Sequence, residues 1–259
     1  MVNKTFNNHT LVENFLTGAK SCPEPGLHAV IFDCDGVLVD TEPLHYQAFQ
    51  KVLGPLGLGH DYNRYLEHFV GFDDRDAFVQ AFEEAGRELS APSLRRLIEA
   101  KSAALAELVA QGTPTFPGVV ELVKSLEHRG VAMAVASGAL RHEVEAFVSS
   151  LGLNGAFRVI VGADDVKKSK PDPETYLLAL DRLRAALAPE RLDTPNCLAI
   201  EDTPAGIHSA KSAGLAVVGV TNSFPAAELT GADKVVGSLS DLDFQAMVTL
   251  LEARRQEQR

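Results

Sequence analysis

The sequence predicts an α/β protein in which helices cover both faces of a parallel sheet and an all-helical block is inserted into that sheet. Three observations predict it. After residue 117, short apolar runs alternate with helical patterns. A first run of the same kind, residues 28–32, stands far before the others. Between them, residues 43–112 show apolar side chains only at helical spacing. Strands joined through helices are expected to be parallel.

The first expected strand, residues 28–32, is apolar and ends in Asp33, Cys34, Asp35 and Gly36. A short run closed by a glycine is typical of a buried strand of a parallel sheet. The two aspartates then follow its carboxyl end, where open α/β sheets bind ligands. Unpaired carboxylates are costly to bury. We therefore expect a metal ion or phosphoryl chemistry here, with a solvated strand end as the alternative.

The chain is expected to divide into an N-terminal extension (1–25), a core (26–42 and 113–259) and a helical block (43–112). Pro43 suits the first turn of a helix, with Thr41 or Asp40 as its cap. Breaks that contain glycine or proline separate helices of about 10 to 17 residues within the block, at residues 54–57, 71–74 and 90–92.

After the block, helix and strand patterns alternate to the end of the chain. The expected strands are residues 131–136, 157–161, 197–200, 216–220 and, at an edge, 234–236. The expected helices are residues 119–129, 141–151, 174–187, 205–213 and 241–255. This order predicts a sheet with helices on both faces.

Composition narrows the class of protein. The formal net charge of −11 argues against nucleic acid or an anionic membrane as a partner. Three irregularly spaced cysteines indicate neither a disulfide framework nor a zinc cluster. The sequence has no apolar run of the roughly 18 residues that span a membrane, and its first residues lack the apolar core of a signal peptide. We expect a cytoplasmic protein, monomeric or weakly homo-oligomeric.

Polar residues also follow three later strands. Ser137 and Gly138 end the second, Lys170 lies beyond the third, and Glu201 and Asp202 end the fourth. In a parallel sheet these ends converge on one edge. Carboxylate oxygens suit a hard divalent cation. A lysine, a hydroxyl and a free amide suit a phosphoryl group. Each strand end alone is weak evidence, but together they predict one site.

The sequences and the order of these segments resemble those of the haloacid dehalogenase-like (HAD) superfamily, in its β-phosphoglucomutase-like and phosphatase branch. The resemblance covers about residues 27–240 and rests on four motifs: 33–42 (DCDGVLVDTE), 136–138 (ASG), 170–173 (KPDP) and 201–207 (EDTPAGI). It implies a three-layer Rossmann-like core, with the helical block in the place of this branch's mobile cap.

The resemblance also implies a mechanism. Asp33 would be the nucleophile that becomes a transient aspartyl phosphate. The Asp33 carboxylate, the backbone carbonyl of Asp35 and the Asp202 carboxylate would hold Mg²⁺, with Glu201 as a further or outer ligand. Asp35 would protonate the leaving oxygen and then take a proton from water. The implied substrate is a small phosphorylated metabolite.

Further residues would contact the substrate if the resemblance holds. Lys170 would bridge nucleophile and phosphate, and Ser137 and the Gly138 amide would hold phosphate oxygens. Glu42 closes the first motif in the manner of the broad sugar-phosphate phosphatases. His45 would help Asp35 adopt its working position, with an ordinary helix-surface histidine as the alternative.

Two departures from the pattern concern substrate choice. Mutases follow the second-motif serine with a hydroxyl and a lysine that bind a second phosphate, whereas residues 138–141 here read GALR. Mutases also use an arginine just after a cap glycine, and Arg75 follows Gly71 one position late. We expect Gly71 to Arg75 to form a specificity loop. Lys101, on a later helix, either faces the cleft or is solvated.

The function that the sequence favours is therefore that of a Mg²⁺-dependent sugar-phosphate phosphatase. A β-phosphoglucomutase is the first alternative, and a receiver-like phosphoacceptor without hydrolase activity is less favoured because the helical block would cover its site. A dehalogenase would need neither Asp35 nor the metal-binding carboxylates. A silent binding protein fits the complete motif set poorly.

Overall fold

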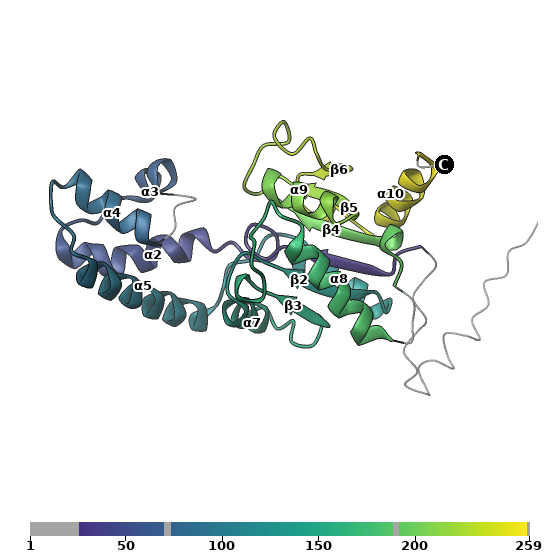
Figure 1. Ribbon diagram of the computed structural model, residues 1–259, viewed down its shortest axis with the longest axis horizontal. Helices are drawn as coiled ribbons and strands as arrows, with labels where there is room; N and C mark the ends of the chain where they lie inside the picture. The colour runs from purple at the N-terminus through teal and green to yellow at the C-terminus, as the bar shows by residue number, and fades with distance from the viewer. Residues whose placement is uncertain (1–25, 70–73, 189–191, 258–259) are drawn as a thin grey trace, which may run out of the picture.

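The computed structural model of the chain describes residues 26–69, 74–188 and 192–257. The strands in these residues form one parallel sheet of six, in the order β3-β2-β1-β4-β5-β6 (Figure 1). Their bounds are β1 Ala29–Phe32, β2 Ala132–Ala136, β3 Val159–Val161, β4 Cys197–Glu201, β5 Ala216–Val220 and β6 Lys234–Val236. The predicted α/β class and parallel sheet are confirmed.

Strand β1 lies at the centre of the sheet. All four of its residues are fully buried, because neighbouring strands flank it and helices cover both its faces. Its Ala29 is in register with Ala132 of β2 and Cys197 of β4. The chain runs outward through β2 and β3 and then returns to the other side of β1 as β4. This reversal of strand order creates the crevice in which such sheets bind ligands.

Helices form a layer on each face of the sheet (Figure 1). One apolar core lies under α6 Val119–His128, α7 Arg141–Ser150 and α10 Phe244–Glu257. The other lies under α8 Glu174–Leu187 and α9 Pro204–Ser212. The last helix begins at Phe244, later than the expected residue 241, because residues 239–241 form a 3-10 turn.

Between β1 and α6 the regular elements of the described residues are helices, which share an apolar core separate from those of the sheet, although parts of α2 and α5 also pack into the core under α6. The helices are α2 Glu42–Leu53, α3 Tyr62–His68, α4 Asp74–Glu84 and α5 Ala91–Gln111. Their expected lengths of about 10 to 17 residues are wrong at two of them. Helix α3 has 7 residues because it begins only after its N-cap residue, Asp61. Helix α5 has 21 residues because no helix breaker interrupts it between its first turn and Gly112.

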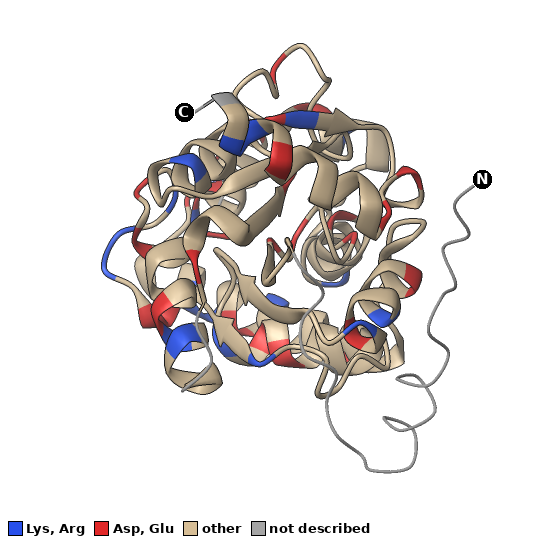
Figure 2. Ribbon diagram, turned by 90° about the vertical axis from the view of Figure 1, so that its right-hand side faces the viewer, with Lys and Arg blue, Asp and Glu red and all other residues tan. Residues whose placement is uncertain are grey.

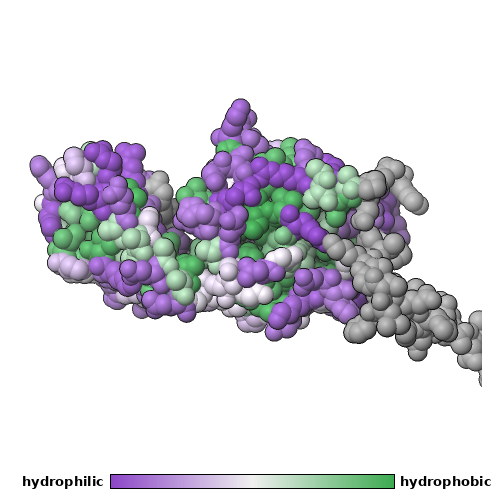
Figure 3. All heavy atoms as spheres, turned by 90° about the horizontal axis from the view of Figure 1, so that it is seen from below, coloured by the Kyte–Doolittle hydropathy of each residue, from purple (hydrophilic) through white to green (hydrophobic). Residues whose placement is uncertain are grey.

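The helical block is joined to the sheet by two neighbouring connections. The Asp40 amide donates to the Pro114 carbonyl at 2.9 Å, and Thr115 Oγ1 donates to the Leu38 carbonyl at 2.7 Å. Helix α5 also contacts α7. The block and the α/β part form two lobes with a narrower region between them (Figure 3). The outgoing and returning chains are thus tied together close to the end of β1.

Acidic and basic residues are intermixed on the outer helices and loops, whereas the sheet carries few of either (Figure 2). Within the part of the chain that the structure describes, no helix combines the length and apolar character needed to cross a membrane.

Candidate active site

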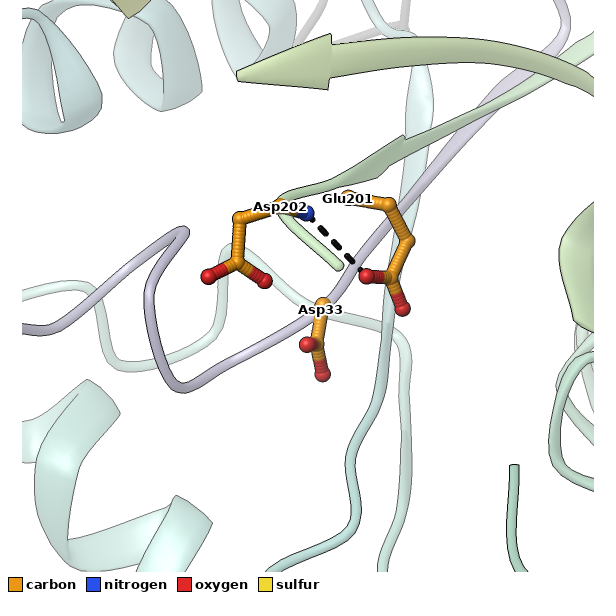
Figure 4. Close-up of side chains that lie close together, drawn as sticks. All are labelled: Asp33, Glu201 and Asp202. Atoms are coloured by element: carbon orange, nitrogen blue, oxygen red, sulfur yellow. Dashed lines mark hydrogen bonds between the residues drawn. The ribbon is translucent and has the colours of Figure 1, made fainter. Parts of the chain in front are cut away.

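Three carboxylates meet where the strand order reverses. Asp33 follows β1, Glu201 ends β4 and Asp202 follows it, and their side chains gather around one space (Figure 4). One oxygen of each lies within 4.8 Å of the others. The exposed fractions are 7% for Asp33, 0% for Glu201 and 1% for Asp202. The sequence-based expectation that these strand ends converge is therefore met.

Lys170 reaches this cluster from the connection between β3 and α8. Its Nζ lies 2.8 Å from Asp33 Oδ1 and 2.7 Å from Glu201 Oε1. Tyr176, a fully buried residue of α8, donates its hydroxyl to Glu201 Oε1 at 2.9 Å. Sequence reasoning missed Tyr176, because an aromatic residue on the inner face of a helix is most often ordinary core. Its ring also lies 5.1 Å from Lys170 Nζ.

The cluster holds more negative charge than its lysine compensates. Burial raises the pKa of Asp33, and the Glu201 carboxylate adds to that rise. Burial also raises the pKa of Asp202 to about 7, against the opposing effect of a hydrogen bond from Ser223. For Lys170, burial acts to lower the pKa, but the two neighbouring carboxylates outweigh it and raise the pKa above its usual value.

These residues fit a divalent cation. Three carboxylates and one ammonium leave two negative charges uncompensated when all are ionised. Asp202 Oδ1 is buried and has no hydrogen-bond partner among the described residues. Oxygen donors of this kind suit a hard ion such as Mg²⁺.

Asp35 lies outside this cluster and has different surroundings. Its Oδ1 accepts a hydrogen bond from Thr41 Oγ1 at 2.6 Å, and burial raises the pKa of its carboxyl group despite that bond. Thr41 stands at the N-cap of α2, as expected, but its side chain does not cap the helix. The hydroxyl bonds to Asp35 instead. Two aspartates separated by one residue thus have distinct environments.

Comparison with known proteins assigns the family. The model of haloacid dehalogenase-like hydrolases matches residues 30–220. The chain belongs to this family. The match runs from β1 to the end of β5 and so includes all the strand ends described above except that of β6.

Several relatives of this HAD hydrolase are named for phosphorylated sugars. A phosphorylated carbohydrates phosphatase of Thermotoga maritima is 32% identical over 199 residues, which cover 76% of this chain and 87% of the relative. A β-phosphoglucomutase of Bacillus subtilis is 29% identical over 225 residues, covering 85% and 94%. The crystal structure of CbbY from Rhodobacter sphaeroides in complex with xylulose-1,5-bisphosphate has a TM-score of 0.70 at 26% identity, covering 85% and 99%.

Ser137 and Gly138 of this HAD hydrolase follow β2 at the same edge of the sheet. Ser137 is buried, and its hydroxyl accepts a hydrogen bond from the Ala139 amide at 2.9 Å. Gly138 is exposed, and a Cβ added to it would meet no atom within 4 Å. Its backbone is therefore accessible to a ligand.

The site residues expected on α2 and in the rest of the helical block have partners of their own. Glu42 accepts a hydrogen bond from the Tyr65 hydroxyl at 2.7 Å, and burial raises the pKa of its carboxyl group. His45 Nδ1 lies 2.8 Å from Lys101 Nζ, which also donates to Asp74 Oδ1 at 2.6 Å. Lys101 is only 2% exposed, so the solvated alternative for it is wrong.

The expected specificity loop is described only in part. Gly71 lies outside the described residues. Arg75 is exposed in the first turn of α4, next to the Asp74 that pairs with Lys101. An acidic residue thus begins the described part of this helix and neutralises the buried lysine.

Two further polar residues reach the site from the connection between β5 and β6. Ser223 Oγ donates to Asp202 Oδ2, and Asn222 Nδ2 donates to the Gly36 carbonyl at 2.7 Å. Sequence reasoning missed both, although β5 was expected and its carboxyl end lies at the edge of the sheet that carries the site. That position was the available signal.

Proposed function

We propose that this HAD hydrolase is a Mg²⁺-dependent phosphatase that hydrolyses a small phosphorylated sugar or a related metabolite through an aspartyl phosphate. The observation that carries the proposal is the difference between the two aspartates at the end of β1. Asp33 contacts Lys170 and lies within 4.8 Å of two carboxylates, whereas Asp35 bonds to Thr41 and has a raised pKa. Groups of one kind in contrasting environments are suited to separate acid–base and nucleophilic roles.

In the first step an Asp33 oxygen attacks phosphorus, and the bond from phosphorus to the sugar oxygen breaks. Protonated Asp35 gives its proton to that oxygen, so the sugar leaves as an alcohol. In the second step Asp35 takes a proton from a water molecule, whose oxygen attacks phosphorus. The acyl-phosphate bond breaks, inorganic phosphate is released, and the Asp33 carboxylate and protonated Asp35 are restored.

Asp33, Asp202 and the backbone carbonyl of Asp35 would hold the Mg²⁺, with Glu201 as a further or outer ligand. When bound, the ion would offset the repulsion between the Asp33 carboxylate and a dianionic phosphate. Lys170 holds Asp33 in place through its 2.8 Å contact and supplies a positive charge to the phosphate. The Ser137 hydroxyl and the Gly138 amide would bind phosphate oxygens.

Hydrolysis is favoured over mutase chemistry by the ion pairs of three cations, which lie on α5, α7 and α8. A mutase must bind a bisphosphate at both ends. Lys101 is already paired with Asp74, and Arg141 with Asp165 at 2.6 Å. Arg182 pairs with the same Asp165 at 2.9 Å. A second phosphate would have to displace these internal partners.

Residues 43–112, which hold α3 to α5 and all of α2 except Glu42, would act as a cap domain over a core of residues 26–42 and 113–259, with residues 1–25 as an extension. The Thr41–Asp35 bond supports this arrangement, because it couples the start of α2 directly to the acid–base residue. Cap closure would exclude bulk water during phosphoryl transfer. We expect slower hydrogen exchange in α2 and α4 when orthovanadate is added, and unchanged exchange would contradict closure.

The experiment that tests the proposed function measures phosphate released from a panel of sugar phosphates, with Mg²⁺ or with EDTA. We expect release only with Mg²⁺, and none from the Asp33→Asn variant, which lacks the nucleophile. Asp181→Asn is the matched control, because the Asp181 side chain is 70% exposed on α8 and should leave the rate unchanged. Metal-independent release, or an active Asp33→Asn variant, would refute the proposal.

The same assay separates the phosphatase from the mutase. With β-glucose 1-phosphate as substrate, glucose 6-phosphate and free phosphate are measured in parallel. We expect phosphate to account for nearly all of the substrate consumed. Conversion to glucose 6-phosphate with little free phosphate would establish the mutase instead.

A further inference from the structure

The connection from β5 to β6 joins the site through two side chains. Asn222 Nδ2 donates to the carbonyl of Gly36 at 2.7 Å, and Ser223 Oγ donates to Asp202 Oδ2. These two bonds tie together the carboxyl ends of β1, β4 and β5. Neither residue belongs to the four motifs identified in the sequence.

The two oxygens of Asp202 have different surroundings. Oδ2 accepts the hydrogen bond from Ser223, whereas Oδ1 is buried and has no hydrogen-bond partner among the described residues. The torsion that rotates an aspartate carboxylate is soft, so a carboxylate held at neither oxygen samples a broad range of angles. A bond to Oδ2 therefore sets the direction of Oδ1. Ser223 thus holds Asp202 with one oxygen left for another ligand.

The turn after Asp35 packs against this pair. Gly36 has a φ of +79°, and a Cβ at this position would clash with the Asp202 carboxylate and lie 2.8 Å from Ser223 Oγ. The Gly36 amide donates to the Val39 carbonyl at 2.9 Å, while its own carbonyl accepts from Asn222. Both polar groups of the residue after Asp35 are therefore held.

We propose that Ser223 is a positioning residue that orients Asp202 for the metal ion, and that Asn222 positions the turn that carries Asp35. Both act through another residue and contact neither phosphate nor water in the reaction. The inference rests on the proposed metal-dependent function. It extends the site to a fifth segment of the chain, after β5.

Binding of Mn²⁺ to the substrate-free protein tests the role of Ser223. The free ion is measured by electron paramagnetic resonance, and Mg²⁺ is then titrated in competition. We expect Ser223→Ala to weaken binding of both ions by about 10- to 100-fold, as is usual when a hydrogen-bond partner of a metal ligand is lost. Ser223→Thr should restore binding because it keeps the hydroxyl. Thr230→Ala is the matched control, since it removes an exposed hydroxyl from the same connection.

Kinetics and folding give the remaining readouts. At limiting Mg²⁺, Ser223→Ala should lose activity, and added Mg²⁺ should restore part of the lost kcat, because the defect lies in metal binding. Its melting temperature in EDTA should match that of wild type, which excludes a folding defect. Asn222→Ala should lower kcat, and excess Mg²⁺ should not restore it, because the turn that carries Asp35 is no longer held.

The outcomes separate this inference from the proposed function. Mn²⁺ binding by Ser223→Ala equal to that of wild type would overturn the role of Ser223. Unchanged kcat in Asn222→Ala would overturn the role of Asn222. In either case, a wild-type protein that binds Mn²⁺ and releases phosphate leaves the proposed function standing. A wild-type protein that binds no Mn²⁺ or Mg²⁺ would refute the proposed function itself.

Discussion

The buried pair of His45 and Lys101 predicts a specific dependence of stability on pH. Lys101 Nζ lies 2.8 Å from His45 Nδ1, and a lysine ammonium can only donate, so this nitrogen must be unprotonated. Burial lowers the pKa of His45 to about 4 from its usual 6.5, and the charge of Lys101 adds to this, while Asp74 acts in the opposite direction. The folded protein therefore keeps His45 neutral at pH values where the unfolded chain protonates it.

The magnitude follows from these two pKa values. Because the pKa is lower in the folded state, the stabilisation is complete above pH 6.5 and is lost as pH falls toward 4. The difference between the pKa values of His45 in the folded and unfolded states corresponds to at most about 3 kcal/mol of unfolding free energy. The ring is partly exposed, so we expect about 2 kcal/mol after solvent screening. His45→Gln keeps an acceptor for Lys101 but does not titrate. The unfolding free energy of wild type minus that of His45→Gln should therefore fall by about 2 kcal/mol between about pH 7 and about pH 4.

Urea unfolding of both proteins in EDTA, from about pH 7 to about pH 4, measures this difference. Other titrating groups cancel because the proteins differ at one residue. Nuclear magnetic resonance should show the His45 ring titrating near pH 4, and in Lys101→Met its pKa should rise, since a neighbouring positive charge is removed while Asp74 remains. A difference that does not vary with pH, or a ring that titrates near 6.5 in wild type, would refute the reasoning.

Three other substitutions test the packing and charges of the site. Lys170→Met should destabilise the metal-free protein by about 3–5 kcal/mol in urea unfolding, because two buried carboxylates lose their cation; an unchanged midpoint would contradict this. Gly206→Ala should cost about 1–3 kcal/mol, since its Cβ would clash with the Glu201 carboxylate, whereas Gly54→Ala meets no atom within 4 Å and serves as the control. Burial acts to raise the pKa of Asp165, but bonds from two arginines outweigh it and hold that pKa low. The stabilisation from ionised Asp165 is thus present above the usual aspartate pKa and lost as pH falls below it. We therefore expect Asp165→Asn to lower the unfolding free energy by about 1–2 kcal/mol near neutral pH and by less in acid. Equal losses at the two pH values would contradict this prediction.

The residues that follow the strands could be predicted because the signals are local. Asp33, Glu201 and Asp202 end or directly follow short apolar runs, and a parallel sheet brings such ends to one edge whatever the details of packing. Lys170 lies nine residues beyond the end of β3, and its place in a motif was the signal for it. The order of the strands then decides which ends are neighbours. The three carboxylates meet because β1 and β4 are adjacent.

Contacts between distant segments could not be predicted in this way. Lys101 and His45 are 56 residues apart, and their pairing depends on how α2 packs against α5. Ser223 is 21 residues from Asp202 and lies in a connection whose path the sequence does not specify. Tyr176 carries no signal that distinguishes it from other core aromatics. In each case the side-chain type fits several environments, and tertiary packing selects one.

The hydrogen bond between Asp40 and Pro114 has a consequence for how such proteins can be recombined. The chain leaves the sheet at one partner and returns at the other, 2.9 Å apart. A short turn could join these two points without changing the register of β1 against β2. On the cap division proposed above, the helices between them would form an exchangeable module. We expect a helical segment from a relative, grafted between these same two residues, to leave the sheet folded and to transfer the relative's substrate preference.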